Sequence, residues 1–110
     1  MSREQLQNLT EPMYYLLLAM TESRHGYDAM QYIRRITGGR VRIGAGTMYT
    51  LLARFEKEHI LVQTAEEGRR KIYALTDKGR DLLEGEITRL RRMLEDADAV
   101  KKEAEPDETA

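Results

Sequence analysis

Residues 44–58 combine two stripes of side chains that both repeat at the spacing of an α-helix. Apolar residues form the first stripe: Met48, Leu51, Leu52 and Phe55. Small polar residues and one arginine form the second: Thr47, Thr50 and Arg54. The spacing predicts an amphipathic helix with one face in a core. The other face suits a DNA major groove, where threonine touches base edges and arginine pairs with guanine. An ordinary core helix has the same apolar pattern, so the flanking segments decide between the two interpretations.

Two more amphipathic helices are predicted ahead of this stretch. The first begins after Thr10, a good N-cap, tolerates Pro12 in its first turn and runs to about Glu22. The second ends at the Gly38 pair and has apolar residues at spacings of three: Tyr27, Met30, Ile33 and Ile36. A short basic connection, 40–43, leads from it into 44–58. Two amphipathic helices joined in this way are typical of a helix-turn-helix unit.

A β-hairpin is predicted directly after the helix at 44–58. Ile60–Val62 and Lys71–Leu75 are β-prone runs, and the segment between them is polar and contains Gly68. Three consecutive basic residues follow this glycine: Arg69, Arg70 and Lys71. A basic loop is commonly just solvated, but beside a candidate recognition helix it favours contact with DNA phosphates or the minor groove.

The C-terminal region carries a heptad-like pattern. Thr76 is a suitable N-cap, and apolar residues then recur at alternating spacings of four and three: Leu83, Ile87, Leu90, Leu94 and Ala97. The pattern favours a helix that pairs with a second copy of the chain, although a helix packed on its own domain looks the same. We expect a DNA-binding domain over 1–78, a dimerisation helix over 79–100 and a disordered tail over 101–110.

Charge is distributed unevenly along the chain. The net charge of −1 conceals a basic segment, residues 24–80, with 12 basic and 6 acidic side chains. Phosphate responds to the local charge of a surface, so the small net charge does not exclude nucleic-acid binding. No apolar run approaches a membrane span, no signal peptide is recognisable and cysteine is absent, which together favour a cytoplasmic protein.

Catalytic chemistry finds little support in the sequence. The two histidines, His25 and His59, lie far apart, and each sits at a predicted helix boundary. No nucleophile motif, metal-ligand spacing or phosphate-binding glycine loop accompanies them. We therefore expect no catalytic residues, no metal and no cofactor, and we expect double-stranded DNA as the partner.

Four blocks of the sequence resemble the PadR family of bacterial transcriptional regulators, in particular its short members with one C-terminal helix. The blocks are His25–Tyr27, Gly46–Tyr49 with Leu52, Phe55–Glu56, and Arg69–Gly79, and the resemblance covers roughly residues 5–95. It implies a mainly α fold with a small β-hairpin wing: a winged helix-turn-helix with a long C-terminal dimerisation helix. It also implies a homodimer, joined through its first and last helices, that binds an operator with dyad symmetry and usually represses.

The patterns and the resemblance together give the expected site residues. DNA contacts are expected from Arg42, Thr47, Tyr49, Thr50, Arg54, Arg69, Arg70 and Lys71. The dimer interface is expected from Leu6, Leu9, Met13, Leu83, Ile87, Leu90, Leu94 and Ala97. Some relatives bind aromatic compounds between subunits, which implies a small apolar or aromatic effector near Met13, Tyr14, Leu90 and Met93. A plain dimer core would use the same residues, so both interpretations stay open.

Two positions depart from the family pattern. Members commonly have glycine where this chain has His59, and serine or asparagine where it has Gly44. Left-handed backbone is uncommon for a residue other than glycine, so we expect strain or a different turn at His59. Gly44 predicts either a weaker helix cap or a closer approach of the backbone to phosphate.

The sequence leaves two functions open. The favoured one is a sequence-specific transcriptional regulator that represses from a palindromic operator as a homodimer. The alternative is a winged-helix protein-interaction module without specific DNA binding, because a fold alone does not fix a function.

Overall fold

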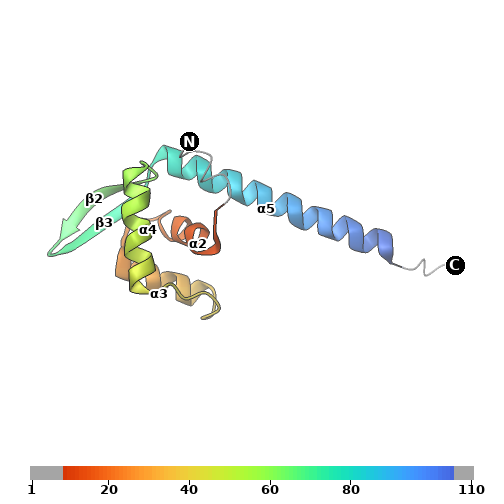
Figure 1. The fold of residues 1–110 in the computed structure, drawn as a ribbon, viewed down its shortest axis with the longest axis horizontal. Helices are drawn as coiled ribbons and strands as arrows, with labels where there is room; N and C mark the ends of the chain where they lie inside the picture. The colour runs from red at the N-terminus through yellow and green to blue at the C-terminus, as the bar shows by residue number, and fades with distance from the viewer. Residues whose placement is uncertain (1–8, 106–110) are drawn as a thin grey trace.

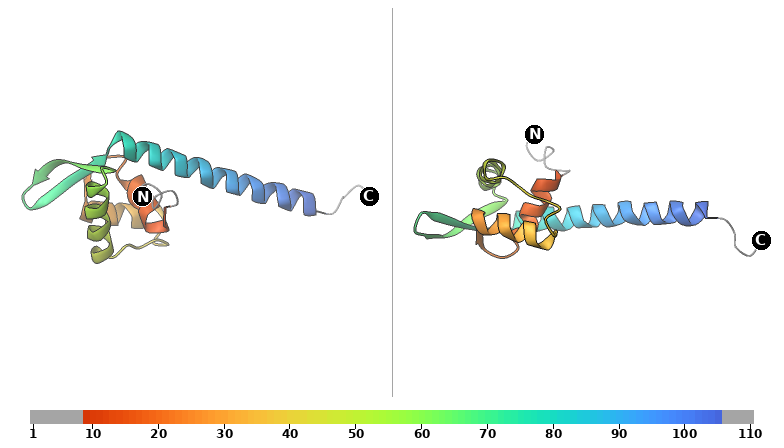
Figure 2. Two further views of the ribbon diagram at one scale, coloured as in Figure 1. Left: turned by 45° about the horizontal axis from the view of Figure 1, so that its top comes forward. Right: turned by 90° about the horizontal axis from the view of Figure 1, so that it is seen from below.

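The structure, a computed structural model, describes residues 9–105 (Figure 1). Its helices are α2 (Glu11–Ala19), α3 (Gly26–Ile36), α4 (Ala45–Lys57) and α5 (Asp77–Ala104). Its strands, β1 (Arg24–His25), β2 (Leu61–Glu67) and β3 (Arg70–Leu75), form one antiparallel sheet in the order β1-β3-β2. The β2–β3 hairpin and α5 project from opposite sides of the α2–α4 body (Figure 2). This is the mainly α architecture with a hairpin wing that the sequence predicts.

Helix α2 begins as expected but ends earlier than Glu22. The Thr10 hydroxyl accepts a hydrogen bond from the Met13 backbone N–H, which caps the first turn. The helix ends at Ala19 because Met20 is fully buried and its carbonyl accepts a hydrogen bond from the N–H of Leu75 in β3. The chain then runs into β1, a strand of two residues that the sequence analysis did not predict.

Helix α4 closes with a left-handed residue, as the departure at His59 suggested. His59 has φ 62°, the N–H of Ile60 donates to the Phe55 carbonyl, and the N–H of His59 donates to the Glu56 carbonyl. These two bonds form a Schellman motif, in which glycine normally occupies the left-handed position. The turn is therefore retained with histidine in a strained conformation. At the other end, Gly44 is the N-cap and provides no side-chain hydrogen bond.

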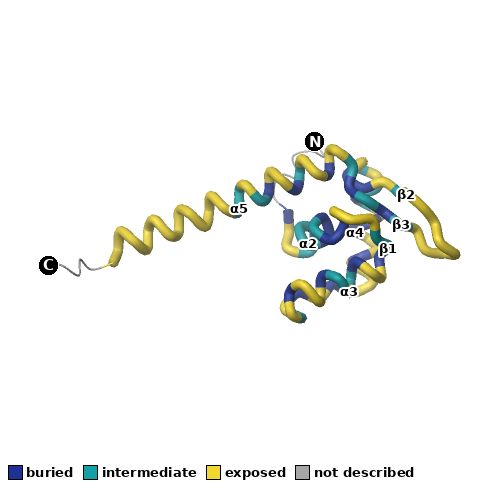
Figure 3. The backbone as a smooth tube through the Cα atoms, turned by 180° about the vertical axis from the view of Figure 1, so that it is seen from behind, coloured by how far each residue is buried: buried dark blue, intermediate teal, exposed yellow. Residues whose placement is uncertain are grey.

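The core lies where α2, α3, α4, the sheet and the first turns of α5 meet. Its largest fully buried side chains include Leu16, Leu17, Ile33, Met48 and Phe55. The apolar face predicted for α4 is buried throughout, whereas Ile36 at the end of α3 is 44% exposed. Figure 3 shows that burial is confined to the body and that the distal half of α5 is exposed.

Helix α5 is longer than predicted, because it continues through residues 101–104, which we had placed in a tail. Residues 106–110 of that tail and Leu6 of the expected interface lie outside the described residues. The Thr76 hydroxyl caps the helix by accepting from the Gly79 N–H. No helix within residues 9–105 is long and apolar enough to cross a membrane.

Three residues expected at a dimer interface are largely buried within the protomer. Leu9, Met13 and Leu83 are 8%, 8% and 2% exposed and belong to the core of the protomer itself. They hold α2 and the start of α5 in place. The heptad pattern included Leu83 because core packing and dimer packing demand the same apolar spacing.

Candidate nucleic-acid interface

The N-terminal half of α4 presents a low, open surface. Thr47, Tyr49 and Thr50 are all exposed and lie outside the buried face of the helix. Gly44 and Gly46 have no neighbouring atoms within 4 Å of where a Cβ would lie. No other element therefore crowds these two glycines at the start of α4, and backbone N–H groups at a helix N-terminus attract anions.

Arg54 lies near the other end of α4 and is already engaged. Its Nε donates to Glu58 Oε2 at 3.2 Å, one helical turn further on. The Arg54 side chain is 36% exposed and that of Glu58 is 15% exposed. Arg54 lies seven residues further along the helix than Thr47, and its Nε is already used by Glu58.

The wing carries its basic residues differently from the predicted loop. Glu67 pairs with Arg70 across the hairpin, so the connection consists of Gly68, with φ 62°, and Arg69. A glycine at the first position of a two-residue connection is typical of a type II′ turn. Lys71 lies in β3 as its β-prone run predicts, and Arg70 also lies in β3 and not in the turn, because β2 extends five residues beyond the predicted Val62. Only Arg69 occupies the tip.

The wing touches the start of α3 through Arg70. Arg70 Nη1 lies 3.3 Å from His25 Nε2, and the guanidinium carbon lies 5.7 Å from the centre of the Tyr27 ring. His25 Nδ1 accepts the Asp28 backbone N–H, so His25 caps α3. A Cβ at Gly26 would lie 2.9 Å from the Tyr49 ring, which shows how closely α3 and α4 meet at this point.

These contacts enclose a basic groove of about 280 Å³ between the wing and α4. Its lining consists of His25, Gly26, Tyr49, Arg69, Arg70, Lys71 and Tyr73. Burial, followed by the charge of Glu56, raises the pKa of Tyr73. Four of the residues expected to contact DNA, Tyr49 and the three wing cations, thus meet in one groove.

Arg42 lies outside this groove, in the connection between α3 and α4. Its Nε donates to the Gly39 carbonyl at 3.3 Å, and it borders a second groove of about 170 Å³. Tyr27, Met30, Gln31, Arg34 and Ile43 line the rest of that groove. His25, Tyr27, Gln31 and Arg34 were not among the residues expected to contact DNA. The sequence indicated His25–Tyr27 only as one of the blocks that resemble a known family, because no local pattern predicts that these residues lie next to the wing.

The predicted effector residues are only partly brought together. Tyr14 and Leu90 border a cavity of about 320 Å³ with Ile87, Arg91 and Leu94, between α2 and α5. Met13 is buried in the core, and Met93 is 52% exposed and does not line this cavity. Burial raises the pKa of Tyr14, and the charges of Tyr15 and Glu86 act in the same direction.

A buried carboxylate next to this cavity was not predicted. Glu86 is 5% exposed and accepts two hydrogen bonds from Arg89, at 2.9 and 2.6 Å. This pairing raises the pKa of Arg89 and neutralises the carboxylate, which explains why a charge is tolerated here. Within residues 9–105 no group of three or more acidic, histidine or cysteine side chains is arranged to hold a metal.

Comparison with known proteins places the fold in a family. The sequence profile described as the transcriptional regulator PadR-like family matches residues 15–85. An uncharacterized 37.1 kDa protein in transposon TN4556 of Streptomyces fradiae is 35% identical over 86 residues, which are 78% of this chain. The chain spans only about a quarter, 24%, of that protein's length.

Solved structures share the fold at lower sequence identity. A PadR-like transcription factor from Bacteroides fragilis superposes with a TM-score of 0.69 at 23% identity, covering 90% of this chain and 95% of that one. Bacillus subtilis PadR in complex with operator DNA gives a TM-score of 0.59 at 24% identity, covering 67% of this chain and 45% of that one. At these identities the likeness establishes the fold alone.

Proposed function

This chain belongs to the PadR-like family of transcriptional regulators, and on that premise we propose that it is a homodimeric repressor that binds an operator with dyad symmetry. The proposed activity is DNA binding alone, and no catalytic step is part of the proposal. One observation carries the proposal most directly: the open N-terminal half of α4 adjoins a groove lined by three wing cations.

Bases are read, in this proposal, from the exposed face of α4. Thr47, Tyr49 and Thr50 enter the major groove with the first turns of the helix, and Arg54 contacts a guanine after leaving Glu58. Arg42, Arg69, Arg70 and Lys71 contact phosphates and fix the position of the protein on the duplex. The structure of Bacillus subtilis PadR with operator DNA supports this use of the shared fold.

Dimerisation is proposed through the exposed apolar side of α5. Leu94 is 63% exposed, on a helix half that no other described element covers. Ile87 and Leu90, closer to the body, are partly buried and border the α2–α5 cavity. Pairing two copies along this side would bury the exposed apolar residues. Binding to successive major grooves would then require the two α4 helices to lie about 34 Å apart, one turn of DNA.

The cavity beside Tyr14 is the proposed place for a small apolar or aromatic effector. Its volume of about 320 Å³ falls at the lower end of the range for ligand pockets. Its walls, Tyr14, Ile87, Leu90 and Leu94, lie on the two helices proposed to meet the partner. A ligand there would alter the angle between protomers and thereby the spacing of the α4 helices.

Selection of bound duplexes from a random pool with the purified chain tests the function. We expect enrichment of one palindromic sequence, and affinity for it that falls steeply with salt because several phosphates are contacted. A flat salt response with no enriched sequence would instead support the alternative, a winged-helix protein-interaction module.

A further inference from the structure

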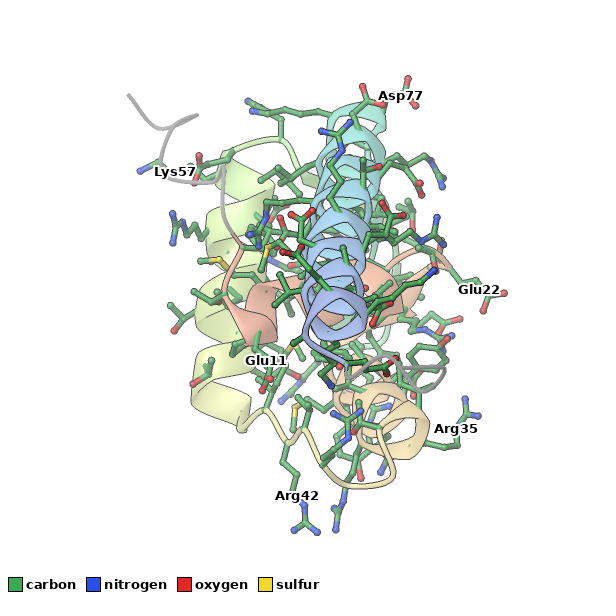
Figure 4. The ribbon with its side chains drawn as sticks, turned by 90° about the vertical axis from the view of Figure 1, so that its right-hand side faces the viewer. Glu11, Glu22, Arg35, Arg42, Lys57 and Asp77 are labelled. Atoms are coloured by element: carbon green, nitrogen blue, oxygen red, sulfur yellow. The ribbon has the colours of Figure 1, made fainter. Side chains whose placement is uncertain are left out.

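A further basic groove lies on α3, and neither the wing nor α4 contributes to it. This α3 groove has a volume of about 590 Å³ and is lined by three arginines, Arg24, Arg34 and Arg35, together with Tyr32 and polar or small residues. Figure 4 shows the Arg35 side chain directed away from α4. The groove therefore opens on a different side of the molecule from the surface proposed to read DNA.

Two guanidinium groups converge on one aromatic ring in this groove. The guanidinium carbons of Arg24 and Arg35 lie 3.9 Å and 5.2 Å from the centre of the Tyr32 ring. Arg24 is fixed in place, because its Nε donates to the Ala19 carbonyl at 2.8 Å. Arg34 and Arg35 are exposed and form no ion pair within residues 9–105. The groove thus presents two cations that lack a counterion in the described part of the chain.

The remaining lining leaves these cations accessible. Asp28 is the one carboxylate among the lining residues, and its Oδ2 lies 3.1 Å from His25 Nε2. A Cβ at Gly38, beside the two arginines, would meet no atom within 4 Å, so the mouth of the groove is open. Guanidinium groups only donate hydrogen bonds, and their fork geometry matches a carboxylate. The ligand that fits this groove is therefore acidic.

The chain carries a segment of this chemistry at the far end of α5. Residues 95–110 contain seven acidic and two basic side chains. The acidic residues of this segment that the structure describes are all exposed and form no ion pair within residues 9–105: Glu95, Asp96, Asp98, Glu103 and Glu105. The groove and this segment are thus complementary in charge, and both are unpaired in the described protomer.

The acidic segment is held away from the α3 groove of its own copy. Every described residue of the chain from 91 onward is exposed, and the stretch from 91 to 104 is about 21 Å of helix (Figure 3). The six residues 105–110 span about 20 Å when fully extended, so they would only reach back along this exposed part of their own helix. The groove that they meet therefore belongs to a second copy.

We propose that the acidic C-terminal segment of one copy, residues 103–110, docks in the α3 groove of a second copy. Its carboxylates accept hydrogen bonds from the guanidinium groups of Arg34 and Arg35, and Arg24 with Tyr32 forms the fixed wall behind them. The contact does not depend on DNA binding, because the groove opens away from α4. It gives the chain a self-association that weakens as salt rises.

Disulfide cross-linking tests this contact directly, because the sequence contains no cysteine. One chain carries Gln31→Cys, at an exposed position in the groove, and the other carries Thr109→Cys. At low salt we expect about five times the yield of the linked pair that Lys57→Cys gives with the same partner, since a few exposed ion pairs together supply about that factor. Lys57 is exposed on α4, outside the groove. In about 1 M salt the two yields should be equal, because the Debye length is then about 3 Å.

A charge exchange provides a second readout. Arg35→Glu in the Gln31→Cys chain should lower the yield to that of the Lys57→Cys control. Glu103→Arg with Glu105→Arg in the Thr109→Cys chain should restore it, because the two charges are then exchanged. All three positions are exposed, so melting temperatures should stay close to that of the unmodified chain. Failure of the exchange to restore the yield would overturn the assigned pairing.

The other outcomes also separate this inference from the proposed function. Equal yields for Gln31→Cys and Lys57→Cys at low salt would overturn the docking. A disulfide within single chains that carry both Gln31→Cys and Thr109→Cys would assign the contact to one copy instead of two. A random-sequence duplex that abolishes the cross-link would make the groove a DNA site. Absence of DNA binding by the unmodified chain overturns only the proposed function, because the cross-link is measured without DNA.

Discussion

Arg70 of the wing lies with its Nη1 3.3 Å from Nε2 of His25, the residue that caps α3. Because Nδ1 accepts the Asp28 N–H, the neutral ring carries its proton on Nε2, which lies 3.1 Å from Asp28 Oδ2. Arg70 Nη1 and His25 Nε2 are then both donors, so no hydrogen bond joins them. The N–H groups of the Arg70 guanidinium are not used by His25 and can donate to a phosphate.

Arg70 and Arg54 are expected to differ in how they affect binding. Arg70→Ala should weaken all duplexes alike and lower the salt slope by about one, because a phosphate contact carries no sequence information. Arg54→Ala should cost about 1–3 kcal/mol at one base position. Competition binding against operators changed at single positions separates the two, with Arg80→Ala as a control on the first turn of α5. A uniform loss for Arg54→Ala would contradict its assignment to a base.

His25 is expected to stabilise the fold through its cap. His25→Ala should cost about 0.5–2 kcal/mol, because the Asp28 N–H loses its acceptor. His25→Asn should recover most of this loss, since asparagine is a favourable N-cap. Urea unfolding of both variants provides the measurement, and equal midpoints for the two would show that capping is not the role of His25.

Two glycines of α5 should respond oppositely to alanine. A Cβ at Gly79 would overlap the Ile60 carbonyl oxygen and lie 3.1 Å from Leu75 Cδ2, so Gly79→Ala should destabilise by about 1–3 kcal/mol. Gly85 has open space around it within the same helix, and Gly85→Ala should stabilise by about 0.8–1 kcal/mol. Melting temperatures of the two variants provide the measurement. A Gly79→Ala variant that melts above the unmodified chain would contradict the tight contact between α5 and the Ile60 carbonyl.

His59 is expected to be a site where the fold gains stability. Replacing it with glycine relieves a left-handed conformation that costs about 1–2 kcal/mol, against about 0.4–1 kcal/mol lost to the freer unfolded chain. His59→Gly should therefore raise the urea midpoint modestly, while His59→Ala, which keeps a Cβ, should not. If the His59→Ala and His59→Gly variants have equal urea midpoints, the strain lies in the imidazole and not in the backbone.

The apolar side of α5 is expected to hold the dimer. Leu90→Glu would place a charge in the proposed interface, where an unpaired charge is strongly unfavourable. Leu94→Glu does the same at a side chain that is 63% exposed in the protomer, so it should not unfold the chain. Sedimentation should show monomers for both, and a dimer for Thr88→Glu on an exposed position of the same helix. If the Leu94→Glu variant remains a folded dimer, the dimer interface does not lie on this side of α5.

Local patterns in the sequence determined the helices and their inward faces. Met48, Leu51, Leu52 and Phe55 are buried as their spacing predicts, and Thr10 and Thr76 cap their helices. These features depend on residues three or four positions apart, so their physics is contained in a short stretch of chain. The glycine at the hairpin turn belongs to the same class, because its φ of 62° is a local demand.

Only the tertiary structure decided what depends on distant residues. Strand β1 exists because Arg24 and His25 pair with Tyr73 and Ile72, almost fifty residues later, and two residues carry no period of their own. Glu86 is buried where α5 packs on α2, although its ion-pair partner Arg89 is local, and Leu83 serves the core of the protomer although its spacing equally suits a partner. Burial is a property of the assembled surfaces, so the sequence could identify which side chains are apolar or basic but not which neighbour each would meet.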